Sequence, residues 1–279
     1  MDRYVVAGNP VEHSQSPFIH TEFARQTGQA MEYGRLLCPL DGFEDSVHAL
    51  AQSGAKGCSI TVPFKVEAFA RGKFVTERAS LAQAANVLRF DAQGWLADNT
   101  DGVGLVNDIE RNAGVTLADK RVLLIGAGGA AAGALGPLLA ARPGEIVVAN
   151  RTLDRVRALV ERHLGSRGAV ALRASPLSGC GTGFDVVINA SASSLKGTGV
   201  PVSHAVLAPG ALALDLMYGP AAQPFLDWAA AHSAHGRDGL GMLVEQAAAA
   251  FELWRGVRPD SAPVLRALRL RMGQAPAQA

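Results

Sequence analysis

Two glycines and an alanine near the middle of the chain have the spacing of a dinucleotide-binding turn. Gly126, Gly128 and Ala131 lie between an apolar run, Val122 to Ile125, and an Ala/Leu-rich segment. In such a turn the first glycine permits a tight bend, the second lets the backbone approach a pyrophosphate, and the small third residue lets the helix pack against the sheet. The helix would direct unpaired N–H groups and a partial positive charge at the phosphates. The spacing therefore predicts a nucleotide cofactor.

The residues after the next apolar run, Ile146 to Ala149, indicate which dinucleotide is bound. NAD-binding folds usually carry Asp or Glu at this strand end to bind the ribose hydroxyls. Here the chain reads Asn150-Arg151-Thr152, with Arg155 one turn later. A guanidinium can bind a 2′-phosphate through paired charge-assisted hydrogen bonds, whereas a carboxylate would repel it. We therefore expect NADP rather than NAD; the alternative is a solvated arginine at a helix start.

A lysine and several short polar residues in the N-terminal part occupy positions that indicate a chemical role. Lys65 would lie near a helix N-terminus, where the helix dipole disfavours a cation. Ser16 precedes a proline and fits the N-cap of a helix, but Ser14 has no such explanation. Thr100 and Asp101 lie in a polar turn before a helix, and capping and catalysis are equally compatible with that position.

Length and composition limit the class of protein. A chain of 279 residues with 48% hydrophobic and 18% charged residues is typical of a globular protein of two domains. The net charge of +1 does not indicate a nucleic-acid partner. Three scattered cysteines, Cys38, Cys58 and Cys180, are typical of free thiols in a reducing cytoplasm. No apolar stretch approaches the ~20 residues of a membrane helix, so we expect neither secretion nor a membrane span. The seven histidines lack metal-ligand spacing, so we expect no metal.

The hydrophobic pattern predicts the elements that position these residues. Predicted strands cover residues 4–7, 32–38, 58–62, 86–90, 95–97, 122–125, 146–149, 170–172, 185–189 and 211–215. One helix is predicted after Ser16 and another after the glycine turn. Further predicted helices cover residues 43–52, 76–84, 103–112, 155–163, 223–232, 239–255 and 262–272. Alternation of strand and helix predicts an α/β fold with mainly parallel sheets. The segment 191–210 is long for a connection, and such loops are often functional.

Seven groups of residues, in unbroken order from about Arg3 to Leu270, together resemble the shikimate dehydrogenase family. They are Gly8-Asn9-Pro10, Ser14-Gln15-Ser16-Pro17, Thr61-Val62-Pro63-Phe64-Lys65, Asn86, Asp98-Asn99-Thr100-Asp101-Gly102, the glycine turn with Asn150-Arg151-Thr152, and Asp238-Gly239-Leu240-Gly241-Met242 with Gln246. The resemblance implies an enzyme of aromatic amino acid biosynthesis. Such an enzyme reduces 3-dehydroshikimate to shikimate with NADPH, reversibly and without a metal.

The resemblance also implies an α/β fold of two domains. A discontinuous substrate-binding domain with a mainly parallel sheet would comprise residues 1–101 and 239–279. A Rossmann-type, doubly wound NADP-binding domain would comprise residues 102–238. The implied partner is the small-molecule substrate, with no nucleic acid and no membrane, and the implied protein is a cytoplasmic monomer or homodimer.

Site residues follow from the same resemblance. Lys65 and Asp101 match the catalytic pair. The substrate-binding positions are Ser14, Ser16, Thr61, Asn86, Tyr218 and Gln246. The cofactor-binding positions are Gly126, Ala127, Gly128, Gly129, Ala130, Asn150, Arg151, Thr152, Arg155, Met217 and Gly239. Val87, Ala132 and Ser191 stand where the family usually has Thr, Arg and Thr, and we expect these departures to tune the activity rather than abolish it.

Two alternatives stay open from the sequence. One is a quinate/shikimate dehydrogenase of broader specificity, against which the two serines and Arg151 argue. The other is a non-catalytic NADP-binding regulator. Lys65 and Asp101 argue against a regulator, because a sensor needs no proton-transfer pair.

Overall fold

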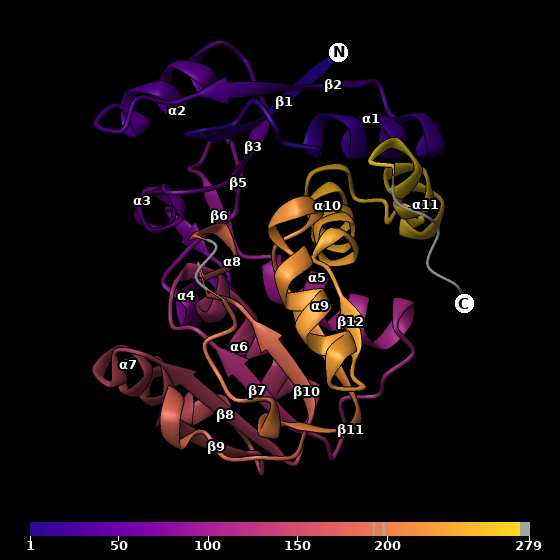
Figure 1. The fold of residues 1–279 in the computed structure, drawn as a ribbon. Coiled ribbons are helices and arrows are strands. Elements are labelled where there is room, and N and C mark those ends of the chain that lie inside the picture. The colour runs from indigo at the N-terminus through magenta and orange to yellow at the C-terminus, as the bar shows by residue number, and fades with distance from the viewer. Residues whose placement is uncertain (192, 197–198, 274–279) are drawn as a thin grey trace. The chain divides into compact units, whose positions relative to one another are not determined.

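The computed structural model describes residues 1–191, 193–196 and 199–273, shown in Figure 1. The chain divides into two compact units, which are described separately. Unit 1 comprises Met1–Gly104 and the chain from Val244 onward, and unit 2 comprises Leu105–Leu243. Both junctions fall inside helices, α5 (Asp101–Asn107) and α10 (Leu240–Arg255). The sequence-based division placed them a few residues earlier, and its assignment of substrate and cofactor roles stays a prediction.

Unit 1 contains a six-stranded sheet in the order β2-β1-β3-β5-β6-β4. Its strands are β1 (Asp2–Gly8), β2 (Met31–Leu37), β3 (Gly57–Ile60), β4 (Phe74–Val75), β5 (Val87–Arg89) and β6 (Leu96–Asp98). The pairs β1–β2, β1–β3 and β4–β6 are parallel, whereas β5 pairs antiparallel with β3 and β6. The antiparallel β5–β6 pair arises because a short turn joins these strands, while parallel neighbours need a longer crossover.

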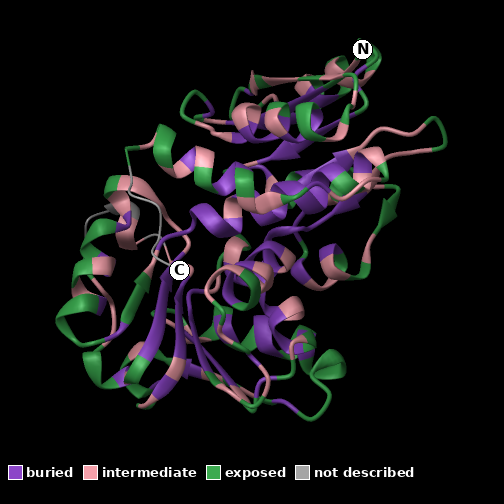
Figure 2. Cartoon of the chain, turned by 90° about the vertical axis from the view of Figure 1, so that its right-hand side faces the viewer, coloured by how far each residue is buried: buried purple, intermediate pink, exposed green. Residues whose placement is uncertain are grey.

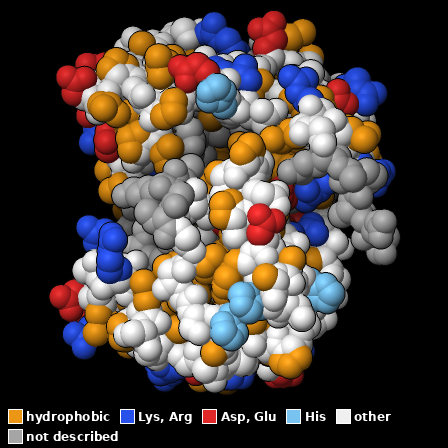
Figure 3. Space-filling view, viewed as in Figure 1, with side chains coloured by type: hydrophobic (Ala, Val, Ile, Leu, Met, Phe, Trp, Pro, Cys, Tyr) orange, Lys and Arg blue, Asp and Glu red, His pale blue; other side chains and the backbone are white. Residues whose placement is uncertain are grey.

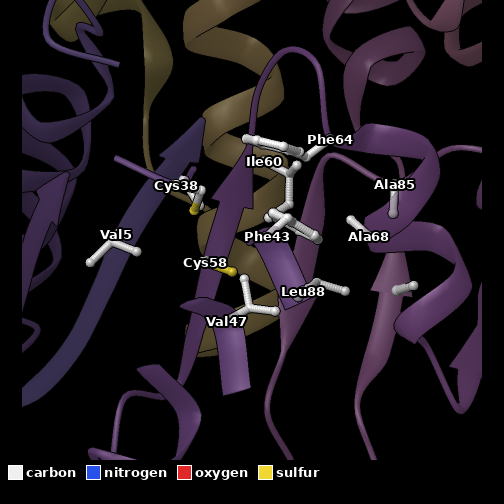
Figure 4. Close-up of a cluster of buried hydrophobic side chains, with 12 residues drawn as sticks. Val5, Cys38, Phe43, Val47, Cys58, Ile60, Phe64, Ala68, Ala85 and Leu88 are labelled. Carbon is white, nitrogen blue, oxygen red and sulfur yellow. The ribbon is translucent and has the colours of Figure 1, made fainter. Parts of the chain in front are cut away.

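Both faces of this sheet are covered by helices. Successive side chains of a strand point to opposite faces, so Val5 and Tyr4 of β1 enter different clusters. Val5 lies in the cluster with Phe43 and Val47 of α2, shown in Figure 4. Tyr4 packs with Trp254 of α10. The helices of unit 1 outside the two junction helices are α1 (Ser16–Thr27), α2 (Phe43–Gln52), α3 (Lys65–Arg71), α4 (Glu77–Ala82) and α11 (Ser261–Arg271).

Unit 2 contains a six-stranded, entirely parallel sheet in the order β12-β11-β10-β7-β8-β9. Its strands are β7 (Arg121–Ile125), β8 (Glu145–Asn150), β9 (Ala171–Pro176), β10 (Phe184–Asn189), β11 (Leu207–Asp215) and β12 (His235–Arg237). The order reverses between β7 and β10, which is the doubly wound Rossmann arrangement. Its central strands are buried along most of their length (Figure 2), which explains their continuous apolar sequences.

The helices of unit 2 connect the strands of its sheet. They are η1 (Asp108–Asn112), which continues α5, then α6 (Gly129–Ala140), α7 (Leu153–His163), α8 (Ser193–Lys196) and α9 (Gln223–Ala231), with short 3₁₀ turns between elements. The predicted loop 191–210 contains α8, a 3₁₀ turn over His204–Val206 and the start of β11; residues 192, 197 and 198 lie outside the described part.

The charged side chains on the surface are distributed as expected for a net charge of +1. Basic and acidic side chains are interspersed on the face shown in Figure 3. Within the described residues, no helix combines the length and the apolar character needed to cross a membrane. The described residues also contain no group of three or more metal-binding side chains.

Candidate active site

Lys65 and Asp101 are in direct contact in unit 1. Each is the first residue of a helix, α3 and α5, and the Lys65 Nζ donates to Asp101 Oδ2 at 2.5 Å. The aspartate side chain is 7% exposed and the lysine 21% exposed, so the ammonium group keeps an accessible side. The contact uses one of its three N–H donors. The carboxylate also offsets the unfavourable position of a cation at a helix N-terminus.

Asn86 connects this pair to two further polar side chains. Its Nδ2 lies 2.8 Å from Asp101 Oδ1, 3.0 Å from Thr100 Oγ1 and 3.1 Å from Gln246 Oε1. An amide NH₂ has only two hydrogens, so at most two of these three contacts exist at one time. Asn86 Oδ1 accepts the Thr100 N–H at 2.8 Å, which fixes the orientation of the amide. Asn86 therefore orients the second oxygen of Asp101 and can exchange one partner for a ligand.

The turn that carries Asp101 is held by an ion pair that the sequence did not reveal. Asp98 is fully buried and accepts two hydrogen bonds from the Arg78 guanidinium, at 2.7 Å and 2.5 Å. It also accepts from the Asn99 N–H at 2.7 Å. Burial opposes ionisation, but Arg78 and the other donors hold the pKa of Asp98 below its ordinary value. Residues 98–101 are thus fixed by a carboxylate that stays charged.

A second polar cluster in unit 1 consists of hydroxyl groups. Ser14 Oγ donates to Ser16 Oγ at 3.2 Å and accepts from the Ser16 N–H at 3.3 Å. The Tyr33 OH donates to Ser59 Oγ at 2.7 Å. Burial raises the pKa of the Tyr33 phenol, more than hydrogen bonds with Ser59 and Ser16 lower it, so the phenol stays neutral. Thr61 is half-buried, and its hydroxyl has no hydrogen bond to another described residue.

The predicted cap of α1 was wrong. The helix begins at Ser16 itself, and the N-cap residue, Gln15, makes no side-chain capping hydrogen bond. The Ser16 side chain instead points into the hydroxyl cluster, where it is 6% exposed. The Ser16 hydroxyl is therefore available for a ligand, whereas Ser14 Oγ already accepts the N–H of Ser16, the first residue of α1. Tyr33 and Ser59 were missed, because neither stands in a recognisable motif.

His20 packs against the hydroxyl cluster through the ring of Tyr33. Its ring is fully buried and stacks on Tyr33, with the ring centroids 4.2 Å apart. Neither ring nitrogen has a hydrogen-bond partner among the described residues. Burial lowers the pKa of His20 to about 3, so the imidazole is neutral at physiological pH. We assign it a packing role, in agreement with the absence of any metal-ligand pattern in the sequence.

In unit 2 the glycine turn has the geometry of a phosphate-binding site. Gly126 has φ +122°, and a Cβ at this position would lie 2.8 Å from the Ala190 carbonyl oxygen, so only glycine fits. At Gly128 and Gly129, by contrast, a Cβ would meet nothing within 4 Å. No side chain caps α6, which begins at Gly129. The helix N-terminus therefore faces open space with free N–H groups, which is what a pyrophosphate requires.

Arg151 and Arg155 lie within one turn of each other after β8. Both side chains are exposed, and neither forms an ion pair or hydrogen bond with another described residue. Their neighbour Arg157, by contrast, pairs with Asp154. Asn150 ends β8, and its Nδ2 donates to the Thr152 carbonyl at 3.3 Å. The guanidinium groups of Arg151 and Arg155 follow β8, the strand that pairs with β7, and thus remain available for an anion.

The last predicted residues of unit 2 follow two neighbouring strands: Met217 and Tyr218 come after β11, and Gly239 comes after β12. The Gly239 N–H donates to the Met217 carbonyl at 2.8 Å, and a Cβ on Gly239 would overlap the Leu216 backbone. Tyr218 is half-buried, and burial raises the pKa of its phenol. Tyr218 thus belongs to unit 2, whereas the other predicted substrate-binding residues belong to unit 1.

The three departures from the family pattern fit their surroundings. Val87 is fully buried in the cluster of Tyr4 and Trp254, where a methyl group packs better than a hydroxyl. Ala132 is buried in the first turn of α6. The Ser191 hydroxyl donates to Asn189 Oδ1 at 2.7 Å, so the serine keeps the hydroxyl that threonine would supply.

The sequence matches three family profiles. Residues 6–88 match "Shikimate dehydrogenase substrate binding domain", residues 108–198 match "Shikimate / quinate 5-dehydrogenase", and residues 239–269 match "Shikimate 5'-dehydrogenase C-terminal domain". The shikimate dehydrogenase (NADP(+)) of Methylibium petroleiphilum is 62% identical over 276 residues, which cover 96% of this chain and 94% of that protein.

Two solved structures are similar to the whole chain. An Ael1 enzyme from Pseudomonas putida has a TM-score of 0.90 at 45% identity and covers 100% of both chains. Shikimate 5-dehydrogenase from Thermus thermophilus, solved in complex with shikimate, has a TM-score of 0.84 at 30% identity and covers 98% of this chain and 100% of that one.

Proposed function

Because this chain belongs to the shikimate dehydrogenase family, we propose that it reduces 3-dehydroshikimate to shikimate with NADPH, reversibly, in aromatic amino acid biosynthesis. The observation that carries the proposal is the contact of Lys65 with Asp101, joined through Asn86 to Gln246. A lysine oriented by a carboxylate, beside hydroxyl and amide groups, suits proton transfer to a polyhydroxylated substrate.

The proton moves through Lys65. NADPH, when bound, would supply the hydride for the carbonyl carbon. The Lys65 ammonium gives a proton to the carbonyl oxygen, so that the ketone becomes a secondary alcohol. In the oxidation direction the lysine, or Asp101 beside it, accepts the hydroxyl proton. Asp101 orients the ammonium group through Oδ2, while Asn86 holds Oδ1, so the pair acts as one unit.

Hydroxyl and amide groups bind the substrate in this proposal. Such groups suit a carboxylate that carries several hydroxyls, because each forms a short directional hydrogen bond. The adjacent hydroxyls of Ser14 and Ser16, neither of which is the N-cap residue of α1, support a role for both serines. The complete proposed set is Ser14, Ser16, Thr61, Asn86, Gln246 and Tyr218.

NADP is the cofactor. The open space over Gly128 and Gly129 and the uncapped N-terminus of α6 suit its pyrophosphate. The free guanidinium groups of Arg151 and Arg155 would bind its 2′-phosphate. The other proposed contacts come from Gly126, Ala127, Ala130, Asn150, Thr152, Met217 and Gly239.

One spectrophotometric assay tests the function. The purified protein is given shikimate with NADP, and separately quinate with NAD, and formation of the reduced cofactor is followed. Rapid turnover of shikimate with NADP alone is expected. Equal efficiency with quinate would favour the broader enzyme, and no turnover with either pair would indicate a binding protein. We further expect a monomer or homodimer. We expect it in the cytoplasm, since all three cysteines are free and buried, as is common in reducing compartments.

A further inference from the structure

A buried carboxylate in unit 2 connects the two backbone segments that leave the C-terminal ends of β10 and β11. Asp215, the last residue of β11, is fully buried. Its Oδ1 accepts the Met217 N–H at 2.9 Å. Its Oδ2 accepts Asn189 Nδ2 at 3.0 Å and a very short hydrogen bond from the Ser194 hydroxyl. Every one of these donors lies in a segment that leaves the C-terminal end of β10 or β11.

The side chain of Asn189 has a fixed direction. Its Oδ1 accepts the Ser191 N–H at 3.2 Å and the Ser191 hydroxyl at 2.7 Å. Its Nδ2 therefore points to Asp215 and to Ser194, 3.0 Å away. Asn189 and Asp215 thus form a polar pair, with the amide as donor and the carboxylate as acceptor.

On its other side, Asp215 supports the segment that precedes α10. The Met217 residue that it holds accepts the Gly239 N–H through its carbonyl. The Leu216 N–H donates to the Asn189 carbonyl at 3.0 Å, which fixes the same segment from the backbone. A chain of hydrogen bonds therefore runs from Ser191 through Asn189, Asp215 and Met217 to Gly239.

This hydrogen-bond network lies at the edge of the sheet where ligands bind in doubly wound folds. Doubly wound sheets bind their ligands at the carboxyl ends of the strands, beside the point where the strand order reverses. Here that point lies between β7 and β10, and Asn189 ends β10. A buried carboxylate is costly, and burial, with a smaller effect of Asp238, raises the pKa of Asp215 despite its donors. Such a costly group is retained where it orders a site.

We propose that Asp215 is a positioning residue of the cofactor site: it holds two segments, through Ser191 and Ser194 after β10 and through Met217 and Gly239 beyond β11, in the arrangement that binds NADP. The inference rests on the proposed function, because it takes this edge of the sheet as the cofactor site. Asp215 touches neither substrate nor cofactor and acts through the two segments. Its removal should therefore weaken NADP binding without changing shikimate recognition by unit 1.

Because Asn189 is the donor and Asp215 the acceptor, exchanging the two residue types tests whether their hydrogen bond matters. In Asp215→Asn, the remaining oxygen can still accept the Met217 N–H, but the new NH₂ faces the NH₂ of Asn189. In Asn189→Asp, two carboxylates face each other. The double variant Asp215→Asn/Asn189→Asp restores one donor and one acceptor in reversed order, and the carboxylate introduced at position 189 still accepts from Ser191. Asp185→Asn, the same change at the opposite end of β10, is the matched control.

The measurements are kcat, the KM values for NADP and shikimate, NADP affinity by titration calorimetry, and Tm. Each single variant should raise the KM for NADP about tenfold, as expected for a lost hydrogen bond to a charged group, with the KM for shikimate nearly unchanged. The double variant should return to within about threefold of wild type. Asp185→Asn, which alters contacts with Lys120 and Arg121 away from this network, should leave kcat and both KM values as in wild type.

Unchanged NADP constants in both single variants, a lower Tm without a kinetic effect, or a double variant that shows no recovery would overturn the proposal. If a variant at Asp215 does not fold, Ser194→Ala removes the hydroxyl that donates to Asp215 and accepts from Asn189, leaves the Asn189–Asp215 contact in place, and should raise the KM for NADP by a smaller factor. An inactive wild-type protein would instead contradict the proposed function, so the two failures are distinguishable.

Discussion

Replacing Asp101 by Asn tests the proposed pairing of Lys65 with a carboxylate. Asp101 uses one oxygen for Lys65 and the other for Asn86. An Asn side chain has a single oxygen, so its NH₂ must face either the ammonium group of Lys65 or the amide NH₂ of Asn86. Either arrangement removes one hydrogen bond, and one between charged groups contributes roughly 1.5–3 kcal/mol, or about 10- to 150-fold.

We therefore expect Asp101→Asn to lower kcat about 10- to 150-fold and to raise the KM for shikimate, because the carboxylate both orients the lysine and lies beside the substrate groups. Steady-state shikimate oxidation with NADP measures both constants. Asp91→Asn, at a half-buried position whose carboxylate pairs with Arg89, serves as the control and should leave both constants unchanged. A variant with both constants within about twofold of wild type would refute the reasoning that the carboxylate orients the lysine.

Three further changes test other parts of the site. Arg151→Ser should raise the KM for NADP roughly 10- to 100-fold and leave that for NAD unchanged, with Arg162→Ser at the far end of α7 as control; equal loss for both cofactors would exclude the 2′-phosphate contact. Ser14→Ala and Ser16→Ala should each raise the KM for shikimate, by a loss of about 1–3 kcal/mol, while the KM for NADP stays constant; an unchanged shikimate KM would show that the serines have a local structural role only. For His20, the folded-state pKa of about 3 lies below the ordinary 6.5, so stability falls as the pH drops from 6.5 toward 3. At pH 4.5 this loss is about 3 kcal/mol relative to neutral pH, and His20→Phe should remove it in urea unfolding measured at both pH values; the same pH dependence in the variant would contradict the assignment.

Local sequence was sufficient to predict the strand, the glycine turn and the helix of residues 121–140. The run Val122 to Ile125, the glycines and the following Ala/Leu-rich segment are contiguous, and each has one dominant structural preference. β4 and β12 were not predicted, because they are two and three residues long and are defined by pairing with a neighbour rather than by their own pattern. The antiparallel pairs of β5 likewise depend on chain topology.

Contacts between distant residues could not be predicted from spacing. Lys65 and Asp101 are 36 positions apart, and only the family resemblance paired them. The Arg78–Asp98 pair and the Tyr33–Ser59 hydrogen bond were missed because single residues on separate elements carry no local signal. Ser16 illustrates the opposite error: its position before a proline suggested a cap, but the hydroxyl cluster provides it with other partners.

The central claim is that Lys65 transfers the proton, and turnover of a Lys65→Met variant at saturating shikimate and NADP tests it most directly. Methionine keeps the length of the side chain and removes the ammonium group, while Lys73→Met, at an exposed lysine, controls for the substitution itself. Positioned acid–base catalysis typically contributes 10²–10⁴-fold, so kcat should fall by at least about 100-fold with little change in shikimate affinity. A Lys65→Met enzyme that turns over at a rate close to wild type would show that the proton takes another route.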